Sequence, residues 1–448
     1  MVLSTVITYL SGLLISRSNQ CKDAKKRSFG RRLWVALSIL LNLAILFFFK
    51  YFHFAALNVN RVLAPLSIQI LEPSFDVLLP VGISFYTFKV LSYTIDVYRG
   101  EIQPSKNLFK YALFVSFFPQ LMAGPIERPK NLIPQLDERH DFDFNRMKNG
   151  LLLMLWGYFQ KMVIADRAAI LVNQVYDHYS DYGMAAIILA TLFFSVQIYC
   201  DFCGYSDIAI GASQIMGFKV MENFKRPYFA VSLRDFWLRW HISLSAWFRD
   251  YVYRPISVSL VKRRWKLKST YFVSSFTVWL LTGLWHGASW NYIVWGGFHG
   301  SVQIIGDIIK PWKEKVYRAL GVRAGNPSFQ PGRMLVTFLI VNFAWIFFRA
   351  PGAKAALLIL QQIFRGGMLT GIQNIGLDVS NLLIAFVSML ILLAVNLFQE
   401  YVGDWRAKLE ERSRPLRWLV YIAAINAVII FGVYGIEYDA TQFFYFQF

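Results

Sequence analysis

Charged residues are scarce in this sequence, and their scarcity excludes an ordinary soluble enzyme. Asp, Glu, Lys and Arg make up only 16% of the 448 residues, whereas soluble chains contain about 25%. Hydrophobic residues reach 56%, and the mean hydropathy is +0.42. This composition also excludes disordered and collagen-like chains. It indicates an all-α polytopic membrane protein of about 10–11 transmembrane helices of roughly 20 residues each.

Cysteine and acidic residues are also few. Cys21, Cys200 and Cys203 provide no disulfide framework, and the Cys200–Cys203 spacing lacks the second ligand pair of a zinc site. The 27 acidic residues stand against 46 basic ones, giving a net charge of +19. In a chain this apolar, the excess is typical of cytoplasmic loops rather than of nucleic-acid binding. The sequence also lacks a GxSxG elbow, a Walker loop and a Rossmann glycine pattern.

The basic loops predict how the chain crosses the membrane. Residues 17–32 hold seven basic residues and one acid, and residues 217–268 end in the basic run 262–268, so both are placed in the cytoplasm. The acidic and aromatic tail from Glu437 is placed outside. Residues 1–16 are interpreted as a shortened first membrane element. The segments expected to cross are 33–49, 76–97, 149–172, 184–216, 270–288, 289–309, 334–348, 381–399 and 418–435.

Two further segments are expected to dip into the membrane or lie on its surface. Residues 108–124 are apolar but interrupted by Pro119, which is typical of a re-entrant element. Residues 353–366 would place Arg365 at an interface. Because no internal repeat or soluble segment is visible, residues 1–448 are interpreted as one membrane-embedded domain.

Three of the six histidines lie in apolar or aromatic surroundings. His286 stands between Gly283 and Gly287 beside Trp285. An ionisable residue in a span marks a functional site, or else a polar contact between two helices, and the residues alone leave both alternatives open. His299, in a similar setting, is interpreted as a packing residue. His53, at an interface, and the loop residues His140 and His178 are given no role. No metal-ligand spacing accompanies any histidine, so no metal site is expected.

Two more segments hold candidate site residues. Residues 232–256 are expected to form a basic, aromatic helix with Trp237, Trp240 and His241 on one face. Such a helix can rest on lipid headgroups or bind an anionic substrate, and its pattern does not decide between them. In DFCGYSD (201–207), carboxylates at membrane depth need partners.

Five stretches together resemble the membrane-bound O-acyltransferase family, in the bacterial polysaccharide branch typified by alginate O-acetyltransferase. They are PVGISFYTF (80–88), FFPQLMAGPIERP (117–129), QIYCDFCGYSDIAIG (197–211), RDFWLRWHISLSAWFRDYVY (234–253) and GLWHGASWNYIVWGGFHG (283–300). The resemblance extends over nearly the whole chain. Cys203 stands where the family has serine, and the start is shorter than usual.

This resemblance implies an enzyme that passes an acyl group from a cytoplasmic thioester, acetyl-CoA, to hydroxyls of an extracytoplasmic polysaccharide or a partner acetyltransferase. His286 matches the catalytic histidine of the WHG motif, and His241 matches the second characteristic histidine. A straight helix from Thr270 would carry His286 close to the outer face, whereas the resemblance implies a deeper position. A break or tilt is therefore expected at Gly283. Residues expected to bind substrate are Trp285, Asp201, Tyr205, Trp240, Arg239 and Arg249.

The remaining expectations concern surroundings and alternatives. The enzyme is expected in the bacterial inner membrane, in contact with lipid and polysaccharide-acetylation partner proteins, with no bound cofactor. Two alternatives stay open: a D-alanyl transferase of the same family that uses a carrier-protein thioester, and a transporter without covalent chemistry.

Overall fold

The computed structural model describes residues 1–66, 79–122, 124–319, 321 and 326–434. These residues form helices and connecting turns, with no β-strand among them. They divide into two compact units, the first made of Met1–Met147 with Ala212–Met221 and the second of Lys148–Gly211 with Glu222–Phe448. The interpretation of residues 1–448 as one domain stays a prediction.

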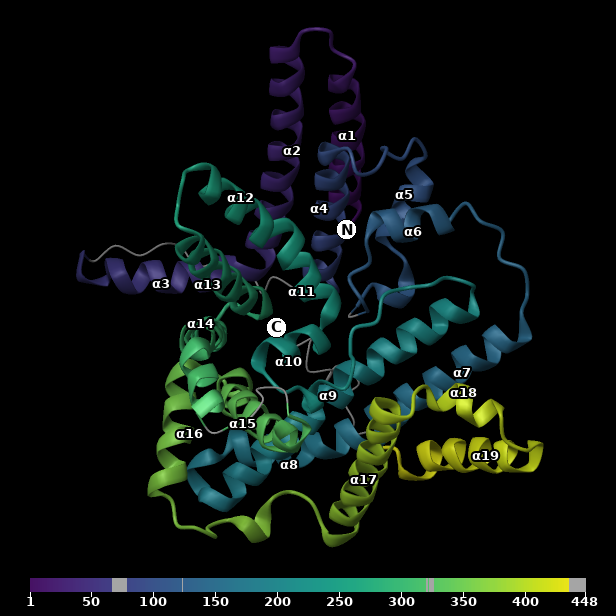
Figure 1. Cartoon of the computed structure of the whole chain (residues 1–448), viewed down its shortest axis with the longest axis vertical. Helices are drawn as coiled ribbons and strands as arrows, with labels where there is room; N and C mark the ends of the chain where they lie inside the picture. Colours follow the sequence, from purple (N-terminus) through teal and green to yellow (C-terminus); the bar gives the residue numbers. More distant parts are fainter. Residues whose placement is uncertain (67–78, 123, 320, 322–325, 435–448) are drawn as a thin grey trace. The chain divides into compact units, whose positions relative to one another are not determined.

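Unit 1 is built on an antiparallel pair of helices, α1 and α2, against which α4 packs (Figure 1). Its helices are α1 (Val2–Asn19), α2 (Ala24–Leu46), α3 (Phe52–Leu63), α4 (Ile83–Arg99), α5 (Leu108–Val115) and α6 (Pro129–Gln135). Asp23 begins α2, because its carboxylate accepts hydrogen bonds from the backbone N–H groups of Lys25 and Lys26. The predicted basic loop 17–32 is therefore mostly helix, with only a short turn after Asn19.

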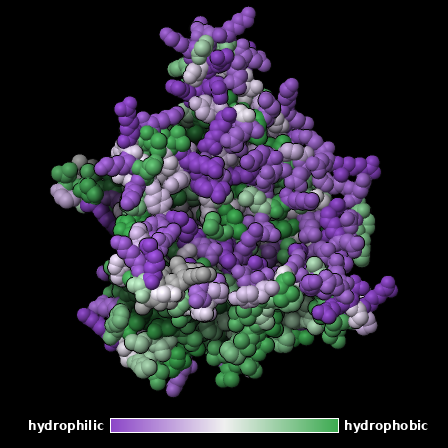
Figure 2. Space-filling view, in the orientation of Figure 1, coloured by the Kyte–Doolittle hydropathy of each residue, from purple (hydrophilic) through white to green (hydrophobic). Residues whose placement is uncertain are grey.

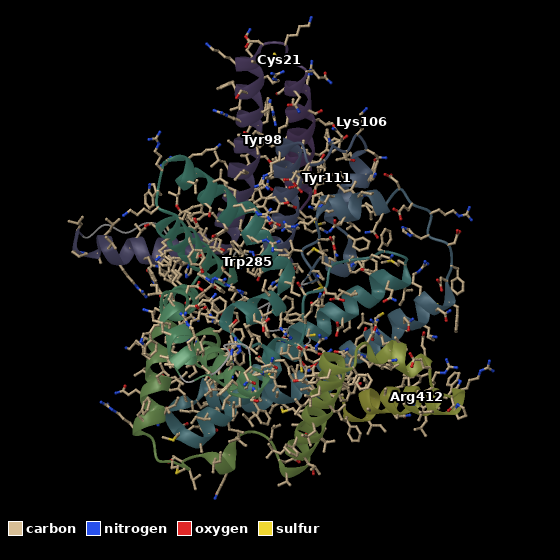
Figure 3. All side chains as sticks on the ribbon, viewed as in Figure 1. Cys21, Tyr98, Lys106, Tyr111, Trp285 and Arg412 are labelled. Atoms are coloured by element: carbon tan, nitrogen blue, oxygen red, sulfur yellow. The ribbon has the colours of Figure 1, made fainter. Side chains whose placement is uncertain are left out.

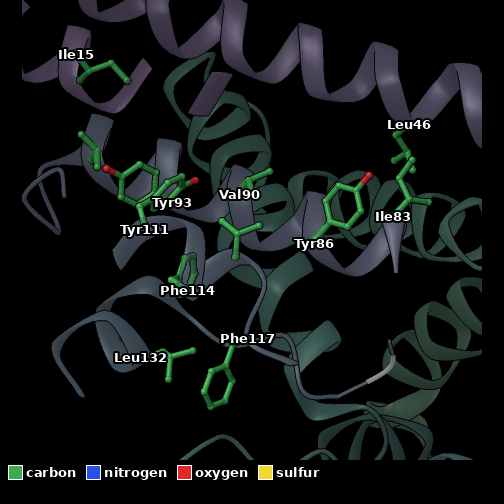
Figure 4. Close-up of a cluster of buried hydrophobic side chains, with 12 residues drawn as sticks. Ile15, Leu46, Ile83, Tyr86, Val90, Tyr93, Tyr111, Phe114, Phe117 and Leu132 are labelled. Carbon is green, nitrogen blue, oxygen red and sulfur yellow. The ribbon is translucent and has the colours of Figure 1, made fainter. Parts of the chain in front are cut away.

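The core of unit 1 combines aliphatic residues with five aromatic ones (Figure 4). Tyr93 and Tyr111 are completely buried, with ring centroids 4.3 Å apart. The Tyr111 hydroxyl shares a 2.6 Å hydrogen bond with Thr8 of α1. This contact connects α5 to α1 through a polar atom that burial would otherwise leave unsatisfied.

Unit 2 contains the remaining helices. They are α7 (Phe144–Tyr158, from Lys148 onward), α8 (Asp166–Asp177), α9 (Met184–Ile215, to Gly211), α10 (Leu233–Arg239), α11 (Ile242–Phe248), α12 (Arg254–Lys262), α13 (Leu267–His286), α14 (Trp290–Ala319), α15 (Gln330–Arg349), α16 (Ala353–Arg365), α17 (Val379–Tyr401), α18 (Trp405–Glu410) and α19 (Arg414–Phe431). The π-helical turn Phe159–Ala165 joins α7 to α8.

Glycines allow α13 and α14 to pack closely. A Cβ atom added to Gly283 would overlap the carbonyl oxygen of Tyr292, and one added to Gly296 would overlap that of Trp279. Small residues at such positions let two helix backbones approach each other. The close packing fixes the end of α13, where His286 lies.

Five helical runs among the described residues are long and apolar enough to cross a membrane. They are Ala24–Leu66, Met184–Ile215, Pro327–Arg349, Val379–Tyr401 and Arg414–Phe431. Two of them, α17 and α19, are exposed over most of their length, whereas α9 is mostly buried. On α17, for example, Val379, Leu383 and Phe386 are more than 60% exposed, and Figure 2 shows hydrophobic side chains over this end of unit 2 and hydrophilic ones over the α1–α2 turn. The predicted total of ten to eleven spans stays a prediction.

Most predicted membrane segments coincide with helices, and α16 matches the expected 353–366 helix. Three expectations are wrong in detail. The helix expected over 232–256 is interrupted at Trp240–His241, and α13 passes through Gly283 without the expected break, while the alternative of a tilt stays a prediction. In addition, α14 continues ten residues beyond the predicted boundary at 309. The start of segment 76–97 and the tail from Glu437 lie outside the described residues.

Candidate functional site

His286 is the last residue of α13, and its side chain is only 3% exposed. Its ring centroid lies 5.0 Å from Trp285, 5.1 Å from Trp295 and 5.0 Å from Phe348. Trp295 belongs to α14 and Phe348 to α15, so three helices enclose the imidazole. An ionisable group in such an enclosure is shielded from water, which favours controlled proton transfer.

The turn after His286 holds this enclosure together. Gly287 ends α13 in an extended conformation, and a Cβ atom there would overlap the ring of Tyr292. Four residues later, the Asn291 amide donates hydrogen bonds to the carbonyls of Phe347 (3.1 Å) and Ala350 (3.0 Å). These bonds tie the start of α14 to the end of α15 and thereby hold Phe348 beside His286.

His241 lies between α10 and α11 and is completely buried. Its ring centroid is 4.6 Å from Phe202 and 5.9 Å from Trp285. Trp285, labelled in Figure 3, therefore contacts both His241 and His286. The structure thus brings both predicted catalytic histidines to one tryptophan.

The backbone and the protonation of His241 are both unusual. Its φ of 43° and ψ of 54° are left-handed, a conformation that costs a non-glycine residue about 1–3 kcal/mol and occurs often at functional sites. Burial lowers the pKa of its imidazole from 6.5 to about 3. His241 is consequently neutral near pH 7, and this strained position breaks the helix expected over 232–256.

His299 is surrounded by tryptophans. Its ring centroid lies 5.1 Å from that of Trp237, 5.3 Å from that of Trp279 and 4.8 Å from that of Trp295, and the residue is completely buried. Neither ring nitrogen has a hydrogen-bond partner among the described residues. These contacts favour the packing role predicted for this residue.

The substrate-binding candidates Arg239, Trp240 and Arg249 lie at the end of α10, directly after it, and directly after α11, and they differ in exposure. Trp240 is buried, with its ring 5.4 Å from Phe236 and 5.2 Å from Trp345. The Arg239 guanidinium bonds Asp235 at 3.0 Å and Glu400 of α17 at 2.9 Å. Arg249 lies beside Asp250 at 3.1 Å, and 55% of its side chain is exposed.

The candidates on α9 belong to a polar network. Asp201 is buried and lies 2.6 Å from the ammonium of Lys161, which also pairs with Asp166 at 2.7 Å. Asp207 accepts a hydrogen bond of 2.9 Å from Gln160. Both carboxylates thus have the polar partners that carboxylates at membrane depth are expected to need. These partners, Lys161 and Gln160, belong to the π-helical turn. Tyr205, one turn beyond Asp201, is partly buried.

No group of three or more histidine, cysteine or acidic side chains gathers at metal-binding distance in the described part of the chain. Cys203 lies 3.8 Å from a carboxylate oxygen of Asp207. The absence of a metal stays an expectation from the sequence.

Two residues that the structure places near the histidines are not singled out by the sequence. Phe348 lies in an apolar run that gives no functional signal. Asn223 lies in a polar loop, and its amide oxygen accepts a 2.6 Å hydrogen bond from the hydroxyl of Ser243, two residues after His241. Only the folded chain reveals these contacts, because both residues are remote in sequence from the histidines they adjoin.

Comparison with known proteins shows the family. Residues 104–320 match the model of the membrane-bound O-acyltransferase family, MBOAT. A probable alginate O-acetylase, AlgI, of Pseudomonas aeruginosa is 37% identical over 86% of this chain and 71% of its own length. AlgI of Azotobacter vinelandii is 34% identical over 94% of this chain and 80% of its own length. A peptidoglycan O-acetyltransferase of Helicobacter pylori is 32% identical over 74% of this chain and 64% of its own length. With its apolar helices, this chain is a multi-pass membrane protein and belongs to the membrane-bound O-acyltransferase family.

Proposed function

We propose that this enzyme transfers an acetyl group from cytoplasmic acetyl-CoA across the bacterial inner membrane to hydroxyls of an extracytoplasmic polysaccharide, or to a partner acetyltransferase. The observation that carries the proposal is His286, buried at the end of α13 and enclosed by Trp285, Trp295 and Phe348. The AlgI proteins are probable O-acetylases and the Helicobacter pylori relative is an O-acetyltransferase, which supports acetyl as the group transferred. Teichoic acid D-alanyltransferases are similar over only about half of this chain.

In the proposed reaction His286 acts as general base. The acceptor hydroxyl attacks the thioester carbonyl while the imidazole takes its proton, so a C–O bond forms and the C–S bond then breaks. The imidazolium returns the proton to the departing CoA thiolate. The aromatic enclosure excludes water that would otherwise hydrolyse the thioester.

Basic residues of the 217–268 stretch are proposed to bind the phosphates of the donor. Arg249, with its largely exposed side chain, is suited to such a contact, whereas Arg239 already bonds Asp235 and Glu400. The neutral imidazole of His241 is proposed to position the donor rather than to accept a proton, because burial lowers its pKa to about 3.

The test is acetyl transfer by the purified full-length enzyme from acetyl-CoA to alginate oligosaccharides. His286→Ala should lower kcat by about 10²–10⁴-fold, the usual cost of losing a general base. The matched control is His299→Ala, which removes another buried, Trp-enclosed imidazole and should mainly lower thermal stability. A folded His286→Ala enzyme with wild-type kcat would contradict the proposal. Turnover only with a D-alanyl carrier-protein thioester would instead support the alternative donor.

A further inference from the structure

The short helix α11 begins without the usual capping residue. A helix leaves its first backbone N–H groups without intrahelical partners, and Ser, Thr, Asp or Asn at the N-cap normally binds them. Here the N-cap is His241, whose side chain makes no capping hydrogen bond. The imidazole instead contacts the rings of Phe202 and Trp285.

Asn223 accepts hydrogen bonds from two of these N–H groups, although it lies 19 and 20 residues before them in the chain. Its backbone carbonyl accepts a hydrogen bond of 3.0 Å from the N–H of Ile242. Its side-chain oxygen accepts one of 3.3 Å from the N–H of Ser243 and one of 2.6 Å from the Ser243 hydroxyl. The first two N–H groups of α11 are therefore satisfied by one residue outside the helix.

Asn223 is itself held in place. Its side-chain N–H donates to the hydroxyl of Ser206 on α9 at 3.3 Å, and its side chain is 1% exposed. Two residues later, the N–H of Lys225 donates to the carbonyl of Arg239 at 2.9 Å. The loop that contains Asn223 is thus fastened to α9, to the end of α10 and to the start of α11.

We propose that Asn223 is a positioning residue for His241, an inference that rests on the proposed function for its effect on turnover. By capping α11 in place of the residue at the N-cap, Asn223 holds His241 in its left-handed backbone conformation and leaves the imidazole directed at Trp285. Loss of the amide would let the junction relax, because the strained conformation persists only where its surroundings impose it.

The experiment compares Asn223→Ala with a matched control, Asn342→Ala, in the full-length enzyme. Asn342 is also a buried asparagine that bonds a serine of α9, since it accepts a 2.7 Å hydrogen bond from Ser195. Two quantities are measured: kcat for acetyl transfer from acetyl-CoA, and the rate at which diethyl pyrocarbonate modifies His241, followed by peptide mass spectrometry. The second readout requires no turnover.

We expect Asn223→Ala to lower kcat by about 10²-fold, the scale of a small misplacement of a catalytic group, and to raise His241 modification. Asn342→Ala should change neither. Asn223→Asp keeps an acceptor for Ser243 and should restore both values toward wild type. Where Asn223→Ala does not fold, Asn223→Ser serves instead, because its hydroxyl is too short to reach both α11 and Ser206.

A folded Asn223→Ala enzyme that matches Asn342→Ala in both readouts would overturn the positioning role. Absence of acetyl transfer by the wild-type enzyme would count against the proposed function alone. In that case the modification rate of His241 still decides whether Asn223 positions it.

Discussion

At the scale of single residues, the left-handed backbone conformation of His241 allows a prediction about thermal stability. Glycine adopts left-handed conformations readily, whereas alanine pays a penalty of about 1–2 kcal/mol there. His241→Gly should therefore unfold at a higher temperature than His241→Ala, although both lack the imidazole and both should lose activity. Equal melting temperatures, or a more stable alanine variant, would show that the left-handed conformation is not retained.

The buried imidazole of His241 also predicts a pH dependence of stability. Its pKa is about 3 in the folded protein and about 6.5 in an unfolded chain. Between these values the unfolded state binds a proton that the folded state does not, so stability falls as pH falls from 6.5 toward 3. His241→Gln should lose less apparent melting temperature than wild type between pH 7 and pH 4.5. Equal losses of melting temperature in both proteins would contradict the lowered pKa assigned to His241.

The sequence singles out candidate site residues, but it does not predict their local geometry. Five motifs indicate the family and single out His286 and His241, because the residue types are characteristic. Helical periodicity over 232–256 nevertheless predicts one continuous helix. The break at His241 depends on hydrogen bonds from Ile242 and Ser243 to Asn223, and a local pattern does not contain contacts between residues 19 and 20 positions apart.

At the scale of helices, the glycines between α13 and α14 determine where His286 lies. Gly283→Ala should force the two backbones apart, because its Cβ would overlap the carbonyl oxygen of Tyr292. We expect lower thermal stability and lower kcat, since α13 ends at His286 three residues later. The measurements are the apparent melting temperature and acetyl transfer.

Gly306→Ala is the matched control for this prediction. Gly306 lies on α14, and a Cβ atom there would meet nothing within 4 Å. Alanine in a helix is more favourable than glycine by about 0.5–1 kcal/mol, so this variant should be as stable as wild type or slightly more so. If both variants behave alike, close packing at Gly283 does not control the site.

The same helices show where prediction from sequence succeeds and where it stops. Hydrophobic runs predict the bodies of α9, α15 and α17, because apolar length is a local property. The end of α13 is different: Gly283 could break a helix or allow close packing, and only the carbonyl of Tyr292 opposite it decides for packing. Helix α14 likewise continues past its apolar part, since its basic end is still compatible with helical backbone.

At the scale of the whole molecule, the basic loops predict the orientation of the chain, and the three native cysteines allow a test. Cys200 and Cys203 are buried in α9, whereas Cys21 is partly exposed at the α1–α2 turn (Figure 3). The surrounding residues 17–32 are strongly basic, which favours the cytoplasmic side. Cys21 is therefore a native reporter of topology.

A maleimide that does not cross the inner membrane should leave Cys21 unmodified in intact spheroplasts and label it after lysis. A cysteine added after Phe448 should label in intact spheroplasts, because the acidic end of the chain is predicted to lie outside. Cys21→Ser provides the background, which should stay low because the two α9 thiols are buried. Labelling of Cys21 before lysis would show that residues 17–32 lie outside and that the chain has the opposite orientation. It would also place the basic 217–268 stretch, and with it the proposed donor entrance, on the side of the membrane that lacks acetyl-CoA.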